Sequence, residues 1–356
     1  MDEKITSREN AKIKYACRLS SSAAFRRSEG RFLAEGRKLC PELARGDALE
    51  TLFYTENALE KCPELAALPG DHYIVEDHVA DKLAEAIREV LTAAQVPETV
   101  LQSIGIVVPG SIDPTGEIVI NAYNLGFHDV PFKKLMEAHF PNVPVLMAND
   151  ANGAALAELY KGAFAGCRTA VLFTLGTGLG GGIILNGKMF NGGMNHGVEL
   201  GHAYLVDEGE ACTCGNRGCV ESYCAASALA RDGARAMQDD PSGMMMEKTG
   251  GNAALVDAKL VVDCAKAGDV TAKRVFDAYV GRLSSACASI FNTLDPEVLA
   301  IGGGLCGAGE FLFAPLRKLV DEKCFYKKNH GPVVPAVMGN DAGIVGAAML
   351  RRDADA

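Results

Sequence analysis

The sequence predicts an α/β protein, because segments typical of strands and helices alternate along most of the chain. One strand, VPVLMAND (143–150), carries Asn149 and Asp150 at its end and leads directly into a helical segment. Two further strands, TAVLFTLG (169–176) and VLAIGGGL (298–305), end in glycine-rich loops. Ligand chemistry in α/β folds collects at the carboxyl ends of strands, so these three turns are the first candidates for a functional site.

The bulk composition indicates a folded protein of two or three domains. The chain has 356 residues and is 48% hydrophobic, which is enough for more than one core. It has no apolar run near the roughly 20 residues that a membrane span needs. The start, MDEKITSRENAKIKY, is too charged for a signal peptide. We therefore expect a soluble cytoplasmic protein, in which the twelve cysteines are thiols or metal ligands rather than disulfides.

Charge is distributed unevenly. Of the 35 basic and 45 acidic residues, ten and five respectively lie in residues 1–38, which leaves +5 there and −15 in the rest of the chain. A basic head on an acidic body indicates two parts with different partners. The alternative is a solvated basic arm.

The first 80 residues predict a small open α/β domain. Its expected strands are 31–36, 51–55 and 72–76, and its expected helices are 37–46 and 57–68. Gly46 closes the first of these helices.

A longer α/β region follows. The pattern predicts helices at 79–97 and 152–160, strands at 103–110, 117–124, 143–150, 169–176 and 298–305, and a hairpin over 180–190. Residues 339–350 are interpreted as a loop that opens the final helix. Asn186-Gly187 is the expected hairpin turn. The segment between the cysteine cluster and residue 298 is mainly helical, and we expect the tail 351–356 to fray.

Three cysteines and a histidine lie within 18 residues and predict a metal site. They are His202, Cys212, Cys214 and Cys219, and the intervening glycines allow a tight loop. Three sulfurs and one nitrogen form a closed tetrahedral set of the kind that holds structural Zn²⁺. The alternative is a group of reduced, unligated thiols. Cys224 follows on an apparent helix and is not included.

Other polar residues surround this cluster in the sequence. Asp150 at a strand end could accept the proton of an attacking hydroxyl, although Asn-Asp at such a turn is also a common helix cap. Glu199 precedes the cysteine loop and Glu221 follows it, so the loop would hold both near His202. Several carboxylates around one imidazole suit a ligand with many hydroxyl groups. The glycine loops could approach phosphates, or they could simply be tight turns.

The order and spacing of these motifs resemble the ROK family, named for repressors, open reading frames and kinases. The segments that carry the resemblance are PGSIDPTGEI (109–118), NLGF (124–127), NDANGAALAE (149–158), LGTGLGGGIILNG (175–187), ELGH (199–202), CTCGNRGCVE (212–221), IGGGL (301–305) and GNDAGIVGAA (339–348). The resemblance covers residues 83–350 and is strongest toward bacterial glucokinases. It implies an actin-like ATPase fold of two α/β lobes, 83–150 and 151–350.

The resemblance also implies a role for each candidate. Asp150 would be the base acting on the 6-hydroxyl of a hexose, with glucose the expected sugar and ATP with Mg²⁺ the phosphate donor. The sugar-binding residues would be Asn149, Asp150, Glu199, His202 and Glu221. The phosphate site would be lined by Gly176, Thr177 and Gly178, and the adenosine site by Gly302, Gly303 and Gly304. Zinc would be held by His202, Cys212, Cys214 and Cys219. The family is commonly oligomeric, so we expect a homo-oligomer.

One departure from the family pattern bears on activity. ROK kinases begin with an Asp-x-Gly-Gly-Thr loop that grips the ATP phosphates, but the first adjacent glycines here are Gly180 and Gly181. The predicted actin-like fold is therefore incomplete, and phosphoryl transfer, which depends on positioning and charge neutralisation, should be impaired. A sugar-binding protein without catalysis is the alternative.

The N-terminal segment resembles a different family. ITSREN, the LSS–FRR run and FLAEG, within residues 1–82, are similar to the substrate-binding domain of SpoU-type RNA ribose 2'-O-methyltransferases. That resemblance implies binding of structured RNA through Arg26, Arg27, Arg31 and Arg37, so RNA binding is a third hypothesis. The methyltransferase domain itself is absent, and residues 1–82 lack the pattern of a helix-turn-helix.

Overall fold

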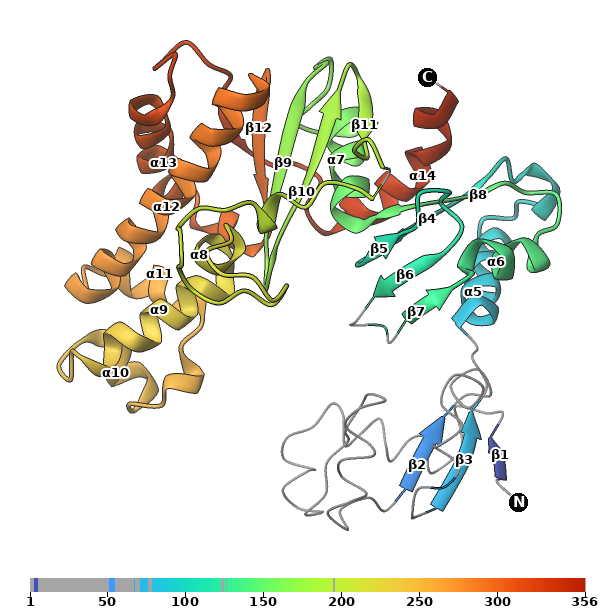
Figure 1. Cartoon of the computed structure of the whole chain (residues 1–356), viewed down its shortest axis with the longest axis horizontal. Helices are drawn as coiled ribbons and strands as arrows, with labels where there is room; N and C mark the ends of the chain where they lie inside the picture. The colour runs from blue at the N-terminus through green and yellow to red at the C-terminus, as the bar shows by residue number, and fades with distance from the viewer. Residues whose placement is uncertain are drawn as a thin grey trace. The chain divides into compact units, whose positions relative to one another are not determined.

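The computed structural model describes residues 3–5, 51–54, 67, 71–75, 79–122, 125, 127–194 and 196–355 (Figure 1). The chain forms two compact units, Met1–Gln95 and Val96–Ala356. None of the helices in the described residues combines the length and the apolar character of a membrane span.

The first unit contains a three-stranded parallel sheet and a helix. The strands are β1 (Glu3–Ile5), β2 (Thr51–Tyr54) and β3 (Asp71–Val75), in the order β1-β3-β2, and the helix is α5 (Val79–Ala93). Strands β2 and β3 confirm the predictions for 51–55 and 72–76. The predicted strand 31–36 and helix 37–46 lie outside the described residues, and so does nearly all of the predicted helix 57–68.

Helix α5 ends before the predicted residue 97. Gln95 has a left-handed φ of 56°, and Pro97 follows two residues later. A residue before proline avoids helical angles, so the helix must stop upstream of Val96.

A five-stranded sheet forms the centre of the second unit, in the order β11-β10-β9-β12-β13. Its strands are β9 (Ala170–Leu175), β10 (Leu179–Leu185), β11 (Lys188–Phe190), β12 (Val298–Gly302) and β13 (Val333–Pro335). β12 runs parallel to β9 and β13, whereas β10 is antiparallel to both of its neighbours. Asn186 and Gly187 both have positive φ, at 56° and 79°, which confirms the predicted hairpin turn.

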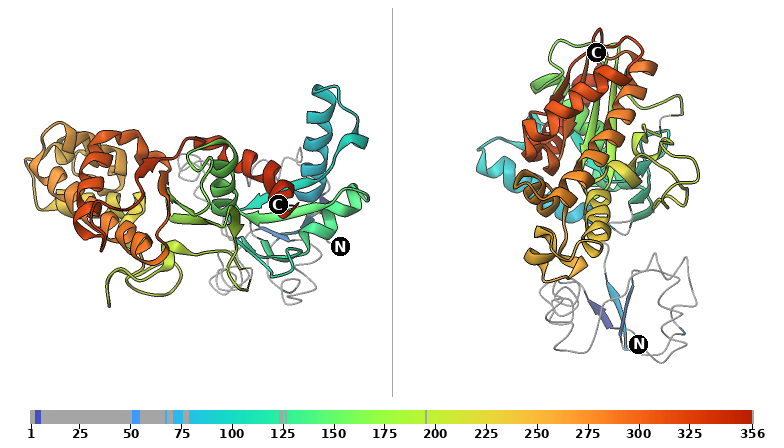
Figure 2. Two further views of the ribbon diagram at one scale, coloured as in Figure 1. Left: turned by 90° about the horizontal axis from the view of Figure 1, so that it is seen from above. Right: turned by 90° about the vertical axis from the view of Figure 1, so that its left-hand side faces the viewer.

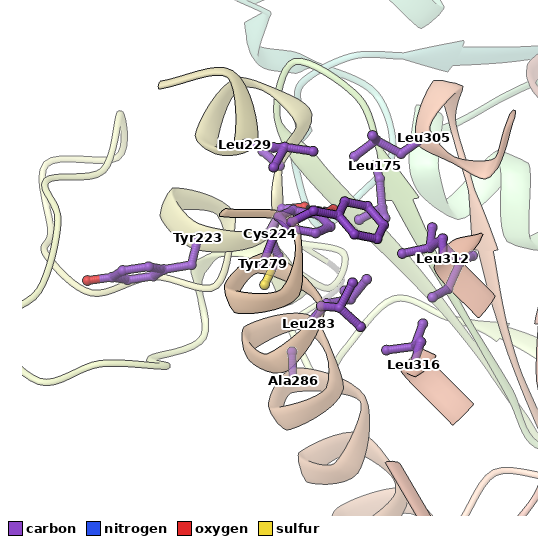
Figure 3. Close-up of a cluster of buried hydrophobic side chains, with 14 of the residues drawn as sticks. Leu175, Tyr223, Cys224, Leu229, Tyr279, Leu283, Ala286, Leu305, Leu312 and Leu316 are labelled. Carbon is purple, nitrogen blue, oxygen red and sulfur yellow. Dashed lines mark hydrogen bonds between the residues drawn. The ribbon is translucent and has the colours of Figure 1, made fainter. Parts of the chain in front are cut away.

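Alternate residues of β9 face two different cores. Val171 and Phe173 belong to a large cluster with the helices of the second unit, whereas Ala170 and Leu172 pack with Ala154 of α7. Figure 3 shows part of the large cluster, which includes Leu175 of the sheet and Tyr279 on α12. The helices on this side are α8 (Glu221–Cys224), α9 (Ala226–Gln238), α10 (Met244–Thr249), α11 (Ala258–Lys266), α12 (Val270–Leu294) and α13 (Glu310–Lys323). They are grouped on one side of the sheet, and α7 and α14 on the other (Figure 2).

Helices α7 (Asp150–Lys161) and α14 (Ala342–Asp355) connect the large sheet to a parallel pair, β4 (Ile104–Val108) and β8 (Val145–Asn149). A separate core of Ala148, Leu156 and Leu350 joins the pair to both helices. The other elements here are β5 (Ser111–Ile112), β6 (Val119–Ala122) and β7 (Phe127–Val130), in one antiparallel sheet, helix α6 (Phe132–His139) and the short helix η2 (Glu98–Val100). Short helices η4 (Leu200–His202), η5 (Ala253–Leu255), η6 (Gly304–Ala308) and η7 (Gly339–Asp341) lie in the loops.

The predicted fraying of residues 351–356 is wrong. α14 continues to Asp355, and the buried carboxylate of Asp353 accepts the N–H of Met189 at 3.2 Å. This contact with β11 holds the last helical turn against the hairpin. Burial raises the pKa of Asp353.

Candidate functional site

Asn149 and Asp150 occupy the junction between β8 and α7, as predicted, but they serve different purposes. The side-chain oxygen of Asn149 accepts the N–H groups of Ala151 at 2.9 Å and Asn152 at 3.3 Å, which makes Asn149 the N-cap of α7. Its amide nitrogen donates to the carbonyl of Gly110 at 3.1 Å. Asn149 therefore caps the helix, which confirms the capping alternative for this residue. Asp150 is not the cap but the first residue of α7.

Asp150 has a raised pKa. Burial is the main cause, and it outweighs the N–H of Ala151, which the carboxylate accepts at 2.9 Å and which acts in the opposite direction. The residue is still solvent accessible, so another molecule could reach its carboxylate. A raised pKa on an accessible carboxylate is typical of a general base poised for proton transfer.

Glu199 lies in the same electrostatic environment as Asp150. Its pKa is raised mainly by burial, and the charges of Asp150 and Glu221 raise it further, whereas His202 acts in the opposite direction. The Nε2 atom of His202 is 4.0 Å from a carboxylate oxygen of Glu199. The fold therefore gathers four predicted residues from three separate segments into one electrostatically coupled group.

The carboxylate of Glu221 is held between two segments. One oxygen accepts the backbone N–H of Leu179 at 2.9 Å, and the other accepts the hydroxyl of Thr213 at 3.0 Å. Gly178 approaches this carboxylate so closely that a Cβ there would lie 2.5 Å from the Glu221 oxygen. A side chain at position 178 would require the Glu221 carboxylate to shift, which links the first glycine loop directly to the acidic group.

The four predicted metal ligands converge. One ligand atom from each of His202, Cys212, Cys214 and Cys219 lies within 4.8 Å of the other three. Nδ1 of His202 is 3.5 Å from Sγ of Cys212, and the Sγ atoms of Cys214 and Cys219 are 3.7 Å apart. A tetrahedral zinc with bonds of about 2.3 Å to sulfur requires sulfur–sulfur edges of roughly 3.8 Å. The set therefore fits a tetrahedral metal ion, and Nε2 of His202 faces the acidic group instead.

Backbone hydrogen bonds shape the metal loop, which we define as residues 212–219. The N–H of Cys212 donates to the carbonyl of Asn216 at 2.8 Å, and the N–H of Gly218 donates to the carbonyl of Glu210, also at 2.8 Å. Single β-bridges pair Tyr204 with Cys219 and Ala211 with Arg217. These contacts place the ligands without a hydrophobic core of the loop's own.

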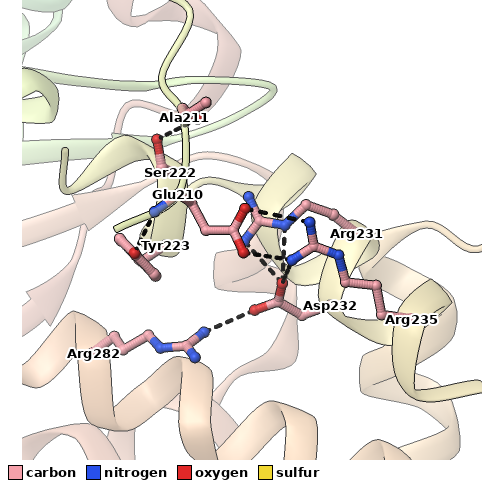
Figure 4. A network of polar contacts seen from close by, with 8 residues as sticks. All are labelled: Glu210, Ala211, Ser222, Tyr223, Arg231, Asp232, Arg235 and Arg282. Atoms are coloured by element: carbon pink, nitrogen blue, oxygen red, sulfur yellow. Dashed lines mark hydrogen bonds and ion pairs between the residues drawn. The ribbon is translucent and has the colours of Figure 1, made fainter. Parts of the chain in front are cut away.

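A polar network beside the loop joins its base to two helices (Figure 4). The N–H of Glu210 donates to the Tyr223 hydroxyl at 2.7 Å, and the carboxylate of Glu210 pairs with Arg235 of α9. Asp232 of α9 accepts from Arg231 at 2.8 Å and from Arg282 of α12 at 2.7 Å. The loop is thus tied to the helical layer by charge-assisted hydrogen bonds.

The two glycine loops meet at one end of the sheet. Gly302 is paired with Thr174 across the parallel strands, and a Cβ at Gly303 would lie 2.2 Å from the carbonyl oxygen of Leu175. Gly304 follows at the surface. In the other loop, the N–H of Gly176 bonds the carbonyl of Gly178 at 3.0 Å. Both loops therefore begin at the same end of the sheet, at the carboxyl ends of β9 and β12.

Helix α9 supports the first glycine loop. The N–H of Ala226 donates to the carbonyl of Gly176 at 2.9 Å, and the hydroxyl of Ser227 donates to the carbonyl of Thr177 at 2.6 Å. Because these two carbonyls accept hydrogen bonds from α9, the backbone of the loop is held in place at Gly176 and Thr177.

Sequence reasoning missed two residues of the site, Thr213 and Leu179. Thr213 lies between two cysteines and Leu179 between glycines, but neither residue type indicates a ligand-binding role. Each residue contributes one hydrogen-bond donor to the Glu221 carboxylate. These contacts depend on tertiary packing and cannot be predicted from the residue types. Asn124, from a motif named above, lies outside the described residues, as do the predicted RNA-binding residues Arg26, Arg27, Arg31 and Arg37.

Fold and site together define a mixed α/β protein with an actin-like kinase fold, in which the acidic group contacts both the metal loop and the first glycine loop. The ROK family model matches residues 70–354. This chain belongs to the ROK family.

Individual relatives agree with this assignment. The glucokinase of Halalkalibacterium halodurans is 34% identical over 277 residues, which cover 76% of this chain and 82% of the relative. A crystal structure of a ROK family glucokinase from Streptomyces griseus, in complex with glucose and AMPPNP, has a TM-score of 0.65 and 29% identity, and the match covers 77% of this chain and 88% of that one. The xylose repressor of Caldicellulosiruptor bescii is 28% identical and matches over 67% of this chain and 59% of its own length.

Proposed function

We propose that this chain is a ROK-type sugar kinase that transfers the γ-phosphate of ATP to the 6-hydroxyl of a hexose, with glucose the expected substrate. The observation that carries the proposal is the raised pKa of Asp150 within a group that includes Glu199, His202 and Glu221. The similarity to glucokinases supports the reaction class.

The proposed chemistry assigns one step to Asp150. Its carboxylate accepts the proton of the sugar 6-hydroxyl, while that oxygen bonds to the γ-phosphorus and the bond from phosphorus to the ADP oxygen breaks. A raised pKa makes the carboxylate a stronger base for this proton. Mg²⁺, bound with ATP, would neutralise charge on the phosphates.

The other residues of the group would orient the sugar. Glu199 and Glu221 would accept hydrogen bonds from sugar hydroxyls, Nε2 of His202 would bond a further hydroxyl, and the Asn149 amide would contact the sugar from the cap of α7. Gly176, Thr177 and Gly178 would line the phosphates, and Gly302, Gly303 and Gly304 the adenosine. These two loops follow adjacent strand ends, which supports a single site for the phosphates and the adenosine of one nucleotide.

We further propose that the metal is Zn²⁺ with a structural role. A set of three sulfurs and one nitrogen leaves no open position for a substrate. His202, Cys212, Cys214 and Cys219 would hold the ion, which would stabilise the loop that carries Thr213 and leads into Glu221.

Activity should be reduced in this chain. It contains no Asp-x-Gly-Gly-Thr sequence ahead of β4, so one phosphate-binding loop of the ROK kinases has no counterpart here. Since phosphoryl transfer relies on positioning and charge neutralisation, we expect a loss of several orders of magnitude, on the order of 10³-fold.

A second candidate is a sugar-binding protein without catalysis. The match to a xylose repressor supports it, because that relative shares the ROK region. In this reading the acidic group and the metal loop would still bind sugar, while ATP would not be turned over.

A third candidate is RNA binding by residues 1–82, which we propose as a separate domain ahead of the ROK region at 83–350. It rests on the sequence resemblance and the basic charge of the segment. RNA affinity that falls steeply with salt, and that disappears when residues 1–40 are removed, would support it.

Hexose-dependent ADP release tests the leading proposal. The purified chain is assayed with Mg²⁺ and ATP on glucose, fructose, mannose and N-acetylglucosamine, with Asp150→Asn as the control. Turnover on glucose that falls by roughly 10²- to 10⁴-fold in the control supports the kinase. Hexose binding without ADP release from the wild-type chain would favour the second candidate, and no hexose binding would reject both.

A further inference from the structure

Both carboxylate oxygens of Glu221 accept hydrogen bonds, and the two donors come from different segments of the chain. Oε2 accepts the N–H of Leu179 at 2.9 Å, from the start of β10. Oε1 accepts the Thr213 hydroxyl at 3.0 Å and lies 3.7 Å from Sγ of Cys212. Thiols are weak donors and 3.7 Å is long, so the hydroxyl is the principal side-chain donor to Oε1.

We propose that Thr213 is a positioning residue that sets the orientation of Glu221 for hexose binding. This inference rests on the proposed sugar site. The last torsion of a glutamate is broad, so a single hydrogen bond from Leu179 leaves the carboxylate plane free to turn. A second donor on the opposite oxygen fixes that plane, and the remaining lone pairs then point in defined directions toward a sugar hydroxyl.

The metal loop positions the hydroxyl of Thr213. Thr213 lies between the ligands Cys212 and Cys214, and its backbone is held by the bonds from Cys212 to Asn216 at 2.8 Å and from Gly215 to Cys212 at 3.1 Å. The same turn that gathers the sulfurs therefore places a hydroxyl against Glu221. This arrangement gives the loop a second task, which is to hold a sugar-binding carboxylate through a residue that is not a metal ligand.

The position has a defined chemical requirement. Serine at position 213 would keep the hydroxyl. Valine would keep the branched shape of threonine but lose the hydroxyl, and alanine would lose both. Only threonine and serine can donate to Oε1.

The test compares hexose affinity and metal content across matched variants. Glucose binding is measured by calorimetry, with zinc content by elemental analysis, for the wild type, Thr213→Val, Thr213→Ala and Thr213→Ser. Thr271→Val is the control, because the Thr271 hydroxyl also donates to a carboxylate, that of Asp240, at 2.6 Å, at the far end of the helical layer. Loss of one hydrogen bond should weaken glucose binding roughly fivefold in the valine and alanine variants. The serine variant and the control should stay within about twofold of the wild type, and zinc content should not change.

Three results would overturn the inference: wild-type glucose affinity in both the valine and alanine variants, a serine variant as weak as valine, or loss of zinc from both variants. The last would show that Thr213 serves the loop and not Glu221. A wild-type chain that binds no hexose would instead reject the proposed function, and the inference with it. Hexose binding by the wild type therefore separates a failure of the proposed function from a failure of the inference about Thr213.

Discussion

Glu158 and Val337 are 179 residues apart in the chain, and the Glu158 carboxylate accepts the backbone N–H of Val337 at 2.8 Å. The same oxygen accepts the N–H of Met338 at 2.8 Å, and the other oxygen accepts that of Ala163 at 2.6 Å. Glu158 is only 1% exposed. One buried side chain on α7 thus anchors the loop that leads through η7 into α14.

Replacement of Glu158 by alanine should destabilise the protein strongly. The change removes the acceptor of three backbone N–H groups in a partly buried setting, so we expect a loss of about 2 to 3 kcal/mol in the free energy of unfolding. Urea unfolding measures the change. Glu310→Ala, which removes an exposed carboxylate paired with Arg317, is the control and should cost less than about 0.5 kcal/mol. Equal effects of the two substitutions would contradict the anchoring role of Glu158.

The raised pKa of Asp150 predicts a stability change that depends on pH. Because the folded-state pKa lies above the ordinary value of 3.8, folding favours the protonated form, and the ionised carboxylate lowers stability at neutral pH. Asp150→Asn should therefore unfold at a higher temperature than the wild type at pH 7. The difference should shrink as the pH falls through the folded pKa and should vanish below pH 3.8. A difference that is constant from pH 7 to pH 3 would show that the charge is not its cause.

Removal of one ligand should release the metal. Cys219→Ser removes a buried thiol of the proposed ligand set, so we expect about one zinc per chain in the wild type and almost none in the variant. Chelation of the wild type should lower its melting temperature, because the loop has no core of its own. Cys167→Ser, outside the cluster, is the control and should keep its zinc. Full zinc content in Cys219→Ser would show that this thiol is not a ligand.

Asp232 should contribute more to stability than a surface ion pair. Its carboxylate pairs with Arg231 and Arg282, and its side chain is 22% exposed. Asp232→Asn would leave these cations without their counter-charge, so we expect a loss of about 1 to 2 kcal/mol in the free energy of unfolding. Asp263→Asn is the matched control, since Asp263 pairs with Lys259 on an exposed helical face and should change little. Identical unfolding midpoints for the two variants would exclude a special role for the network.

Local patterns predicted the elements that carry the site. β8, β9 and β12 lie inside the predicted strand ranges, and the Asn186-Gly187 turn has the expected positive φ angles. These features depend on residues close in sequence: alternating apolar side chains, and turn residues that tolerate a left-handed backbone. The tail was predicted wrongly because its order depends on Asp353 reaching Met189, on another element.

The convergence of His202 with Cys212, Cys214 and Cys219 is what the sequence by itself predicted about the site, because these residues lie within 18 positions and need only a short segment to meet. The tertiary structure decided which side chains support them. The carboxylate of Glu221 accepts the N–H of Leu179, on a strand 42 residues upstream. The carboxylate of Glu158 accepts the N–H of Val337, in a loop 179 residues downstream. Such bonds form only when separately predicted elements pack at particular distances, and that packing is a property of the whole core rather than of any local pattern.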